Sequence, residues 1–414
     1  MRDPDRLELE LAAPGASPPI TRRRFLQASA GAALATGLSH PSLAGAKDAV
    51  VVPFVGEGSF PLEESVGEGL GRRRALDLST LGPDSLLTTQ DRFFIRTGCP
   101  DPLPSAAAWK VRVHGLVETP REIPIDELRR ESVDQGPQLL ECAGNSRALH
   151  FGLMSVGRWS GVRLERVLER VRPRPAATRV LVSGVDEHKV LDAGSVPGAS
   201  WIFGLGEIRE AGAFLATQMN GAPLAPDHGY PVRLVVPGWY ACTAIKWVNE
   251  IALVDDEAMA TAQMREYAGR TLQAPAGPRD QQLIEAGRRP EGPPLARDFR
   301  PATIDPAALP VRVEKLRSGE GRASYRVVGI LWGGPVRGTA PARGLRIRID
   351  PGFPEAPVEA IETNARSPWT LWSHRFAMKR PGRYRIELAL GDGAVRTRKL
   401  DRGFYAREIE VTGD

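Results

Sequence analysis

Cysteine is scarce in this sequence, and its scarcity excludes two classes of protein. Only three cysteines occur among 414 residues, Cys99, Cys142 and Cys242. Three thiols cannot form the disulfide framework of a small secreted domain, and no cluster of Cys and His has the spacing of a zinc finger. The sequence also lacks a Cys-x-x-Cys-His motif, so we expect no covalently attached c-type haem.

Long apolar runs and long basic runs are also missing. No stretch of about 18 consecutive apolar residues is present, so we expect no membrane-spanning helix in the mature chain. The formal net charge is +5, from 55 Lys and Arg against 50 Asp and Glu. A surplus this small, without a basic tail, does not indicate a nucleic-acid partner, although it is compatible with an anionic substrate.

Length and composition indicate a folded protein of more than one domain. Apolar residues make up 42% of the chain and charged residues 25%, which is typical of globular proteins. A length of 414 residues exceeds that of one ordinary domain and suits two. The hydrophobic patterns described below divide the chain further.

Residues 1–46 have the organisation of an export signal. Three arginines at 22–24 precede an apolar stretch over 25–38, and small residues then lead to Ala-Gly-Ala at 44–46. A charged region, a short apolar core and an A-x-A site are typical of a secretory signal. Paired arginines followed by Phe-Leu resemble the twin-arginine signal, which exports folded proteins, so we expect a periplasmic protein. The alternative is an amphipathic N-terminal helix.

Residues 47–87 form an N-terminal extension, and residues 88–272 mix strand and helix patterns. Alternation of apolar and polar residues predicts a half-buried strand over 110–114. Apolar residues at i, i+3, i+4 and i+7 predict an amphipathic helix over 164–171. Runs rich in β-branched residues predict further strands, over 179–183, 232–236 and 245–253.

The C-terminal third of the chain has a different pattern. A segment over 273–305 is rich in proline and has no apolar period, so we interpret it as a connection between domains. Over 306–414 the pattern consists of short alternating strands, such as 345–349, which fit a β-sandwich of immunoglobulin-like size. The sequence therefore predicts an α+β chain, with a mixed domain followed by an immunoglobulin-like β-sandwich.

Cys142 is the first candidate for chemistry. It ends an apolar run and opens the segment Cys-Ala-Gly-Asn-Ser-Arg, which ends at Arg147. The small residues allow a ligand to approach the backbone. A fixed cation nearby favours the thiolate, which is the form that binds a metal or attacks a substrate. Taken alone, however, such a cysteine is more often a small buried hydrophobe.

Three further motifs give this cysteine a context. An Asp-His-Gly-Tyr-Pro-Val-Arg run covers 227–233, a Lys-Trp pair follows at 246–247, and Arg-Phe-Phe-Ile-Arg covers 92–96. Together with the Cys-Ala-Gly-Asn segment, these motifs resemble those of the sulfite oxidase family of molybdenum enzymes, in the family's order and spacing. The resemblance begins at about residue 88 and implies a sulfite-oxidase-type molybdopterin domain followed by a dimerisation domain, hence a homodimer.

The resemblance implies a cofactor site and a substrate site. In it the Cys142 thiolate ligates molybdenum, and a group of residues holds the pterin and its phosphate: Phe94, Arg96, Asp186, His228, Arg233 and Lys246. The same resemblance implies that Arg96 and Arg147 bind the anionic substrate, that Tyr267 is the active-site tyrosine and, on a looser match, that Arg402 is a third pocket arginine.

Each of these residues also has an ordinary structural interpretation. Arginines are most often surface ion-pair partners, His228 has the setting of a turn residue, and Lys246 has that of a solvated residue at a strand edge. Tyr267 alone could be a packing residue. We interpret Cys99 and Cys242 as non-catalytic, and three tryptophans as core or interface residues: Trp332, Trp369 and Trp372.

The implied reaction is the oxidation of sulfite to sulfate, with electrons passed to a separate c-type cytochrome or similar acceptor. The segment over 148–158 is shorter than in several members of the family. This difference keeps a second hypothesis open, in which the same cofactor serves a sulfane dehydrogenase of a thiosulfate-oxidising complex or a sulfoxide reductase. A third hypothesis is an exported β-rich binding protein that is not an enzyme.

Overall fold

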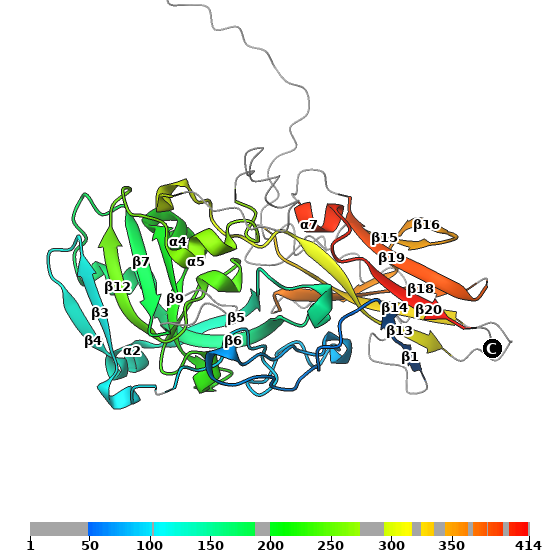
Figure 1. Ribbon diagram of the computed structural model, residues 1–414, viewed down its shortest axis with the longest axis horizontal. Helices are drawn as coiled ribbons and strands as arrows, with labels where there is room; N and C mark the ends of the chain where they lie inside the picture. Colours follow the sequence, from blue (N-terminus) through cyan, green and yellow to red (C-terminus); the bar gives the residue numbers. More distant parts are fainter. Residues whose placement is uncertain are drawn as a thin grey trace, which may run out of the picture. The chain divides into compact units, whose positions relative to one another are not determined.

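Strands dominate the part of the chain that the structure describes (Figure 1). The computed structural model describes residues 49–101, 103–186, 199–273, 294–316, 324–334, 344–362, 367–378, 380–391 and 397–412. The predicted export signal over 1–46 lies outside these ranges, and so does most of the predicted connection over 273–305. In the described ranges, no helix is long and apolar enough to cross a bilayer.

Two five-stranded sheets form the central domain. The first has the order β4-β3-β12-β7-β8, made of β3 (Lys110–Gly115), β4 (Arg121–Pro124), β7 (Arg179–Gly184), β8 (Ser200–Gly204) and β12 (Val248–Val254). The second has the order β10-β9-β6-β5 with β11 beside β9, made of β5 (Val133–Glu141), β6 (Met154–Arg163), β9 (Phe214–Met219), β10 (Ala222–Pro223) and β11 (Arg233–Val235). The strands β3 and β12 pair in parallel, which requires the long excursion between them.

Short helices accompany these sheets: α2 (Ile125–Glu131), α3 (Leu164–Glu169), α4 (Leu205–Ala211) and α5 (Ala262–Tyr267). The helix α3 confirms the predicted amphipathic pattern, because it buries Leu164, Val167 and Leu168. The strand β3 likewise buries Val111 and Val113 between exposed neighbours, as the alternation predicts.

One strand boundary was predicted wrongly. The run over 245–253 predicts a single strand, but β12 begins only at Val248. Trp247 has a φ of 53°, in the left-handed region that a strand cannot accommodate. Lys246 therefore lies in a loop before the strand, not at a strand edge, and its side chain turns into the protein.

Two further five-stranded sheets form the predicted β-sandwich. One has the order β1-β13-β14-β18-β17, made of β1 (Val50–Val52), β13 (Ala307–Leu316), β14 (Ser324–Trp332), β17 (Ala360–Glu362) and β18 (Trp369–Ala377). The other has the order β16-β15-β19-β20-β2, made of β2 (Phe54–Val55), β15 (Leu345–Asp350), β16 (Phe353–Pro357), β19 (Gly382–Leu390) and β20 (Arg407–Val411). A short helix, α7 (Arg398–Asp401), precedes β20.

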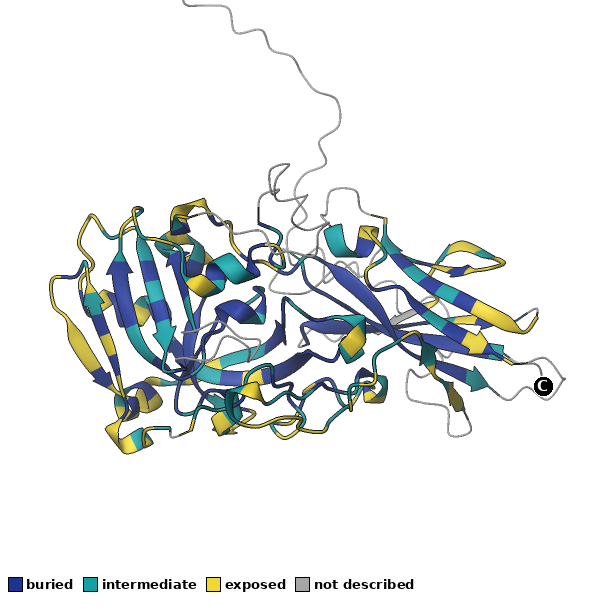
Figure 2. Ribbon diagram, in the orientation of Figure 1, coloured by how far each residue is buried: buried dark blue, intermediate teal, exposed yellow. Residues whose placement is uncertain are grey.

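The sandwich core is apolar and aromatic. Trp332, Trp369 and Trp372 are fully buried, which confirms the interpretation of these tryptophans as core residues. Figure 2 shows the buried strands of this region, with exposed residues concentrated in β16 and at strand ends. Burial of these large rings supplies much of the sandwich's hydrophobic stabilisation.

The N-terminal extension is built into the sandwich. The strand β1 pairs with β13, and β2 pairs with β20. Glu57 then accepts a hydrogen bond from Arg407 Nε at 2.7 Å, and the two side chains are 4% and 5% exposed. Arg407 also donates to the Pro310 carbonyl at 2.9 Å. The extension and the C-terminal sheet are therefore one packed unit.

The sandwich also contacts the segment that carries the candidate cysteine. Glu141, the last residue of β5, is fully buried and accepts hydrogen bonds from Trp332 Nε1 at 2.8 Å and from the Tyr405 hydroxyl at 3.2 Å. Burial raises the pKa of Glu141, and the two donors oppose that rise in part. The residue before Cys142 is thus held by side chains from the sandwich.

We expect Glu57→Gln to destabilise the fold by about 3–5 kcal/mol, because it leaves the buried Arg407 guanidinium without its counter-charge. Glu122→Gln is the matched control, since its ion pair with Lys110 has side chains 57% and 56% exposed and exposed ion pairs contribute little to stability. Urea denaturation measures the free energy of unfolding of both variants. Equal free energies of unfolding for the two would contradict a structural role for the extension.

Candidate functional site

One pocket brings together eight of the ten predicted site residues. It contains about 790 Å³ of space free of protein atoms, part of it open to solvent. The predicted residues in its lining come from the segment over 94–96, from the loops that follow β5 and β7, from β11 and the loops beside it, and from α5: Phe94, Arg96, Cys142, Asp186, His228, Arg233, Lys246 and Tyr267. Residues up to 173 positions apart in sequence therefore share one cavity wall, from Phe94 to Tyr267.

The Cys142 thiol is held at the end of β5 by a tight loop. The Cys142 N–H donates to the Leu153 carbonyl at 2.9 Å, and its own carbonyl accepts from the Asn145 N–H at 2.9 Å. The buried Asn145 side chain closes the loop, because it donates to the Phe151 carbonyl at 2.8 Å and accepts from the Leu153 N–H at 3.0 Å. These bonds aim the thiol into the pocket and explain the Cys-x-x-Asn spacing.

Two cations line the pocket, the buried Arg233 and the half-buried Lys246. Arg233 donates to the carbonyls of His228 and Ala244, both at 3.1 Å, and stacks 5.3 Å from the Trp159 ring centroid. Its Nε has no hydrogen-bond partner among the described residues. Burial lowers the pKa of Arg233 to about 9. Burial also lowers the pKa of Lys246, and the positive charge of Arg233 lowers it further.

Backbone carbonyls from two loops orient Lys246. Its Nζ donates to the Asp227 carbonyl at 2.8 Å and to the Thr97 carbonyl. Gly229 permits this close approach, because a Cβ there would lie 2.9 Å from Arg233 Cβ and 3.2 Å from Lys246 Cβ. The φ of Gly229 is also positive, at 98°, which suits glycine.

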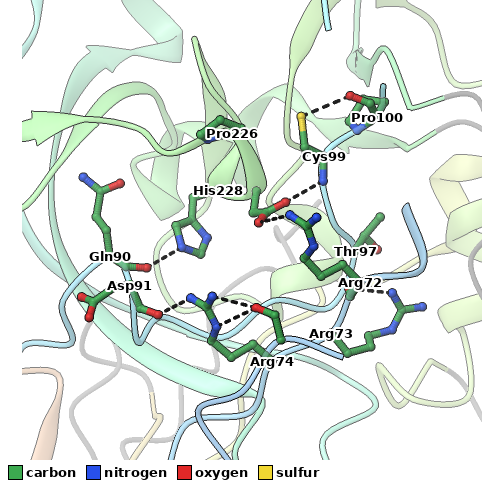
Figure 3. Close-up of polar contacts among 12 residues, drawn as sticks. Arg72, Arg73, Arg74, Gln90, Asp91, Thr97, Cys99, Pro100, Pro226 and His228 are labelled. Carbon is green, nitrogen blue, oxygen red and sulfur yellow. Dashed lines mark hydrogen bonds and ion pairs between the residues drawn. The ribbon is translucent and has the colours of Figure 1, made fainter. Parts of the chain in front are cut away.

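Asp227 ties the N-terminal extension to this base. Its Oδ2 accepts from Arg72 Nη1 at 3.0 Å, and its Oδ1 accepts from the Cys99 N–H at 2.8 Å; the two donor residues are labelled in Figure 3. Burial raises the pKa of Asp227, but these two donors outweigh it and hold the pKa below its usual value. The carboxylate therefore stays charged and pairs with the extension, not with the pocket's two cations.

His228 is a neutral residue of the pocket wall. Its Nε2 donates to the Gln90 carbonyl at 2.8 Å (Figure 3), which leaves Nδ1 as the acceptor. Burial lowers the pKa of His228 to about 4, and the charges of Lys246 and Arg233 add to this effect. The Phe93 ring packs edge-on at 5.3 Å between centroids and fixes the imidazole plane.

Three further predicted residues complete the wall. The Asp186 carboxylate accepts from the Ala199 N–H at 2.8 Å, and burial raises its pKa. The Phe94 N–H donates to Ser155 Oγ at 3.2 Å, which places the Phe94–Arg96 segment against β6. Burial, followed by the charge of Cys142, raises the pKa of Tyr267, so its phenol keeps its proton at neutral pH.

Two predicted arginines lie outside the lining of this pocket as the described residues define it. Arg147 begins a short 3-10 helix (Arg147–Leu149), is half-buried, and donates from Nη2 to the Ala406 carbonyl of the sandwich. Arg402 is exposed at the end of α7. The substrate roles assigned to these two residues stay predictions.

Sequence reasoning missed several residues that shape the site. Cys242 lines the pocket, and burial followed by the charge of Cys142 raises the pKa of its thiol. Gln263 lies in the lining too and donates to the Cys242 carbonyl. Trp159 supports Arg233 from behind. No sequence motif marks these residues, because Cys242 lies in a short 3-10 helix, Gln263 on α5 and Trp159 on β6, and only long-range packing brings them together.

The pocket fits a molybdopterin phosphate. Arg233 is buried and Lys246 is half-buried, and no described carboxylate forms an ion pair with Arg233. Burying a cation without a counter-charge is costly, and an anion at the unpartnered Arg233 Nε would remove that cost. The thiol of Cys142 at the other side of the same cavity supplies one soft ligand of the kind that a molybdenum ion takes.

Comparisons with known proteins agree with this site. Residues 99–262 match the family model described as the oxidoreductase molybdopterin binding domain. Sulfite oxidase of Gallus gallus is 30% identical over 203 residues, 45% of this chain and 43% of that protein. The mitochondrial sulfite oxidase of Rattus norvegicus is 30% identical over 201 residues, 45% of this chain and 36% of that protein. The nitrate reductase [NADPH] of Mycosarcoma maydis is 32% identical over 211 residues, 44% of this chain and 21% of that protein.

The fold has a solved counterpart as well. The sulfane dehydrogenase SoxCD from Paracoccus pantotrophus superposes with a TM-score of 0.57 and covers 84% of this chain and 89% of that chain. Its sequence identity is 17%, so the similarity concerns the fold alone.

Site and fold together define a molybdopterin-dependent oxidoreductase. Residues 99–262 form an oxidoreductase molybdopterin binding domain, so the cofactor is molybdenum held by molybdopterin, and sulfite oxidases are among the relatives of this chain. This finding confirms the resemblance seen in the motifs and disfavours the hypothesis of a binding protein without enzymatic activity. The chain spans less than half the length of these three curated relatives, at 43% or less of each.

We expect the cofactor-free protein to lose stability as the pH falls from about 6.5 toward 4. His228 has a pKa of about 4 in the fold and 6.5 as its ordinary value, so the unfolded chain binds the proton first. The contribution of the neutral imidazole to the free energy of unfolding is fully present above pH 6.5. It decreases by up to about 3 kcal/mol as the pH falls to about 4.

Urea denaturation across this pH range measures the effect. His228→Gln should have a flatter dependence of the unfolding free energy on pH, because an amide does not titrate. An unchanged pH dependence in this variant would show that another group causes the acid destabilisation.

Proposed function

We propose that this protein oxidises sulfite to sulfate in the periplasm. The observation that carries the proposal is the Cys142 thiol, which shares one basic pocket with Arg96 and Tyr267. Relatives named sulfite oxidase match 45% of the chain at 30% identity. An anionic substrate of small size suits a pocket in which cations predominate.

The chain's own residues have separable tasks in this reaction. Cys142 would ligate the molybdenum, while Asp186, His228, Arg233 and Lys246 would hold the pterin and its phosphate. When bound, the cofactor supplies the two-electron redox step and the oxygen transfer. Arg96 would hold the sulfite anion by charge-assisted hydrogen bonds.

Tyr267 would act as a neutral hydrogen-bond donor. Its pKa is raised, first by burial and then by the charge of Cys142. A phenol that stays protonated can donate to a substrate oxygen across the whole pH range in which sulfite is ionised. Because α5 carries Tyr267 and the helix is anchored by its Thr261 N-cap at 3.2 Å from the Met264 N–H, the donor is held in place.

Location, acceptor and assembly belong to the same proposal. The twin-arginine pattern in residues 1–46 supports export in the folded state. The absence of a Cys-x-x-Cys-His motif from the sequence supports a separate electron acceptor, which we propose to be a soluble c-type cytochrome. We propose a homodimer formed through the immunoglobulin-like sandwich, as the family resemblance implies.

A second reaction is supported by the position of Arg147. Its guanidinium donates to the Ala406 carbonyl and is not in the pocket lining, so the described pocket has one fewer cation than the resemblance implies for sulfite. A sulfane dehydrogenase or a sulfoxide reductase would need less fixed positive charge. We therefore keep these reactions as the alternative.

Metal analysis combined with a substrate panel tests the proposal. The purified protein should contain molybdenum and pterin and should reduce cytochrome c or ferricyanide when sulfite is added. Thiosulfate-derived sulfane substrates and sulfoxides, with a dye acceptor or donor, form the rest of the panel. Turnover of one of these substrates in place of sulfite would favour the alternative reaction.

We expect Cys142→Ser to lose sulfite oxidation by more than about 100-fold, because a serine hydroxyl cannot replace a soft thiolate as metal ligand. Cys99→Ser is the matched control, since Cys99 is half-buried and lies outside the pocket lining. Steady-state assays and molybdenum content of both variants measure the difference. Full activity in Cys142→Ser would refute the ligand assignment.

A further inference from the structure

The N-terminal extension places a second arginine beside Arg96. Arg74 and Ile95 pair in antiparallel fashion, with both N–H···O=C bonds at 2.9 Å. In this register the residue before Arg74 lies directly opposite the residue after Ile95, so Arg73 faces Arg96 with both side chains on the same side. Arg96 lines the pocket, and Arg73 is its nearest cross-strand neighbour by register.

The Arg73 side chain is oriented by its own loop. Its Nη1 donates to the Leu70 carbonyl at 3.0 Å and to the Arg72 carbonyl at 2.9 Å. Gly98 allows the extension to lie this close, since a Cβ there would be 2.1 Å from the Gly69 carbonyl oxygen. The half-buried guanidinium is thus held in one place against the Phe94–Arg96 segment.

Arg73 and Arg96 are two like charges in facing positions of the antiparallel pair. The pKa of Arg73 is lowered to about 10, first by burial and then by the charge of Arg96. The negative charge that Tyr267 or Cys142 has when ionised would raise the pKa of the same guanidinium. Arg73 is therefore within electrostatic reach of the metal ligand, the active-site tyrosine and the pocket arginine at once.

Its two neighbours in the Arg72-Arg73-Arg74 run point elsewhere (Figure 3). Arg72 pairs with Asp227 at 3.0 Å. Arg74 donates to Ser65 Oγ at 2.7 Å and to the Asp91 carbonyl. Only the middle arginine of the three is directed by strand register to the side on which Arg96 lies.

We propose that Arg73 is a substrate-binding residue, which together with Arg96 clamps the tetrahedral or pyramidal sulfur oxyanion on the substrate side of the pocket. This inference rests on the proposed function and deepens it, because it makes the N-terminal extension part of the substrate site. Like Arg147, Arg73 is not in the pocket lining as the described residues define it, but strand register sets it opposite Arg96, which is in the lining.

The test compares Arg73→Gln with Arg74→Gln in the cofactor-loaded protein. Both variants remove one positive charge from adjacent positions, but only the first removes a ligand of the oxyanion. Arg73→Gln should raise the KM for sulfite and the Kd for sulfate, measured by calorimetry, by about 10- to 150-fold. Arg74→Gln should change either value by less than about twofold.

Arg73→Lys is the second variant, for the case that the glutamine variant does not fold. A lysine keeps the charge but loses the planar guanidinium, so an intermediate rise in KM and Kd is expected. Molybdenum content and Tm equal to those of the unsubstituted protein confirm that each variant is intact.

The outcomes separate this inference from the proposed function. A protein that oxidises sulfite but keeps its KM and sulfate Kd in both Arg73 variants would overturn the role of Arg73 alone. Equal rises in KM and Kd for Arg73→Gln and Arg74→Gln would show that only the loss of positive charge matters. This result would also overturn the role of Arg73 as a ligand of the substrate. A protein that turns over no sulfite before any substitution would overturn the proposed function.

Discussion

Buried positive charge is the constraint on which this structure depends. Arg233 and Lys246 lie at the base of one cavity, each with a pKa lowered by burial. The carboxylate closest to Arg233 in sequence, Asp227, is engaged by Arg72 and by the Cys99 N–H. An anionic cofactor satisfies this arrangement, because its phosphate restores the counter-charge that folding alone leaves out. Because the Cys142 thiol lines the same cavity and can ligate a metal, we infer that this anionic cofactor holds a metal ion.

The rest of the chain serves to hold this cavity in place. The sandwich side chains of Trp332 and Tyr405 fix Glu141, the residue that precedes the metal ligand. The N-terminal extension adds one strand to each sandwich sheet and then returns to the pocket with its arginine run. Both ends of the described chain therefore act on the site, although the family match covers only residues 99–262.

Local patterns predicted a large part of this fold. The alternation of apolar and polar residues in β3 and the helical spacing of apolar residues in α3 both match the buried faces of these elements. Such patterns arise because one face of the element contacts solvent and the other contacts the core. The motifs around Cys142 and His228 both contribute residues to the pocket lining. They are recognisable in the sequence because the tight loops that carry them require particular residues. Contacts between residues distant in sequence could not be predicted from local patterns. The bond between Arg147 and the Ala406 carbonyl and the facing of Arg73 and Arg96 both depend on pairings across the fold.

The most direct test is the Tm of Arg233→Met measured with and without the cofactor. If the buried guanidinium exists to balance the molybdopterin phosphate, the substitution lowers the Tm of the cofactor-loaded protein far more than that of the cofactor-free protein. The cofactor-free variant gains from the loss of an uncompensated charge, which offsets the two lost bonds to backbone carbonyls. An equal fall in Tm for both forms would contradict the account.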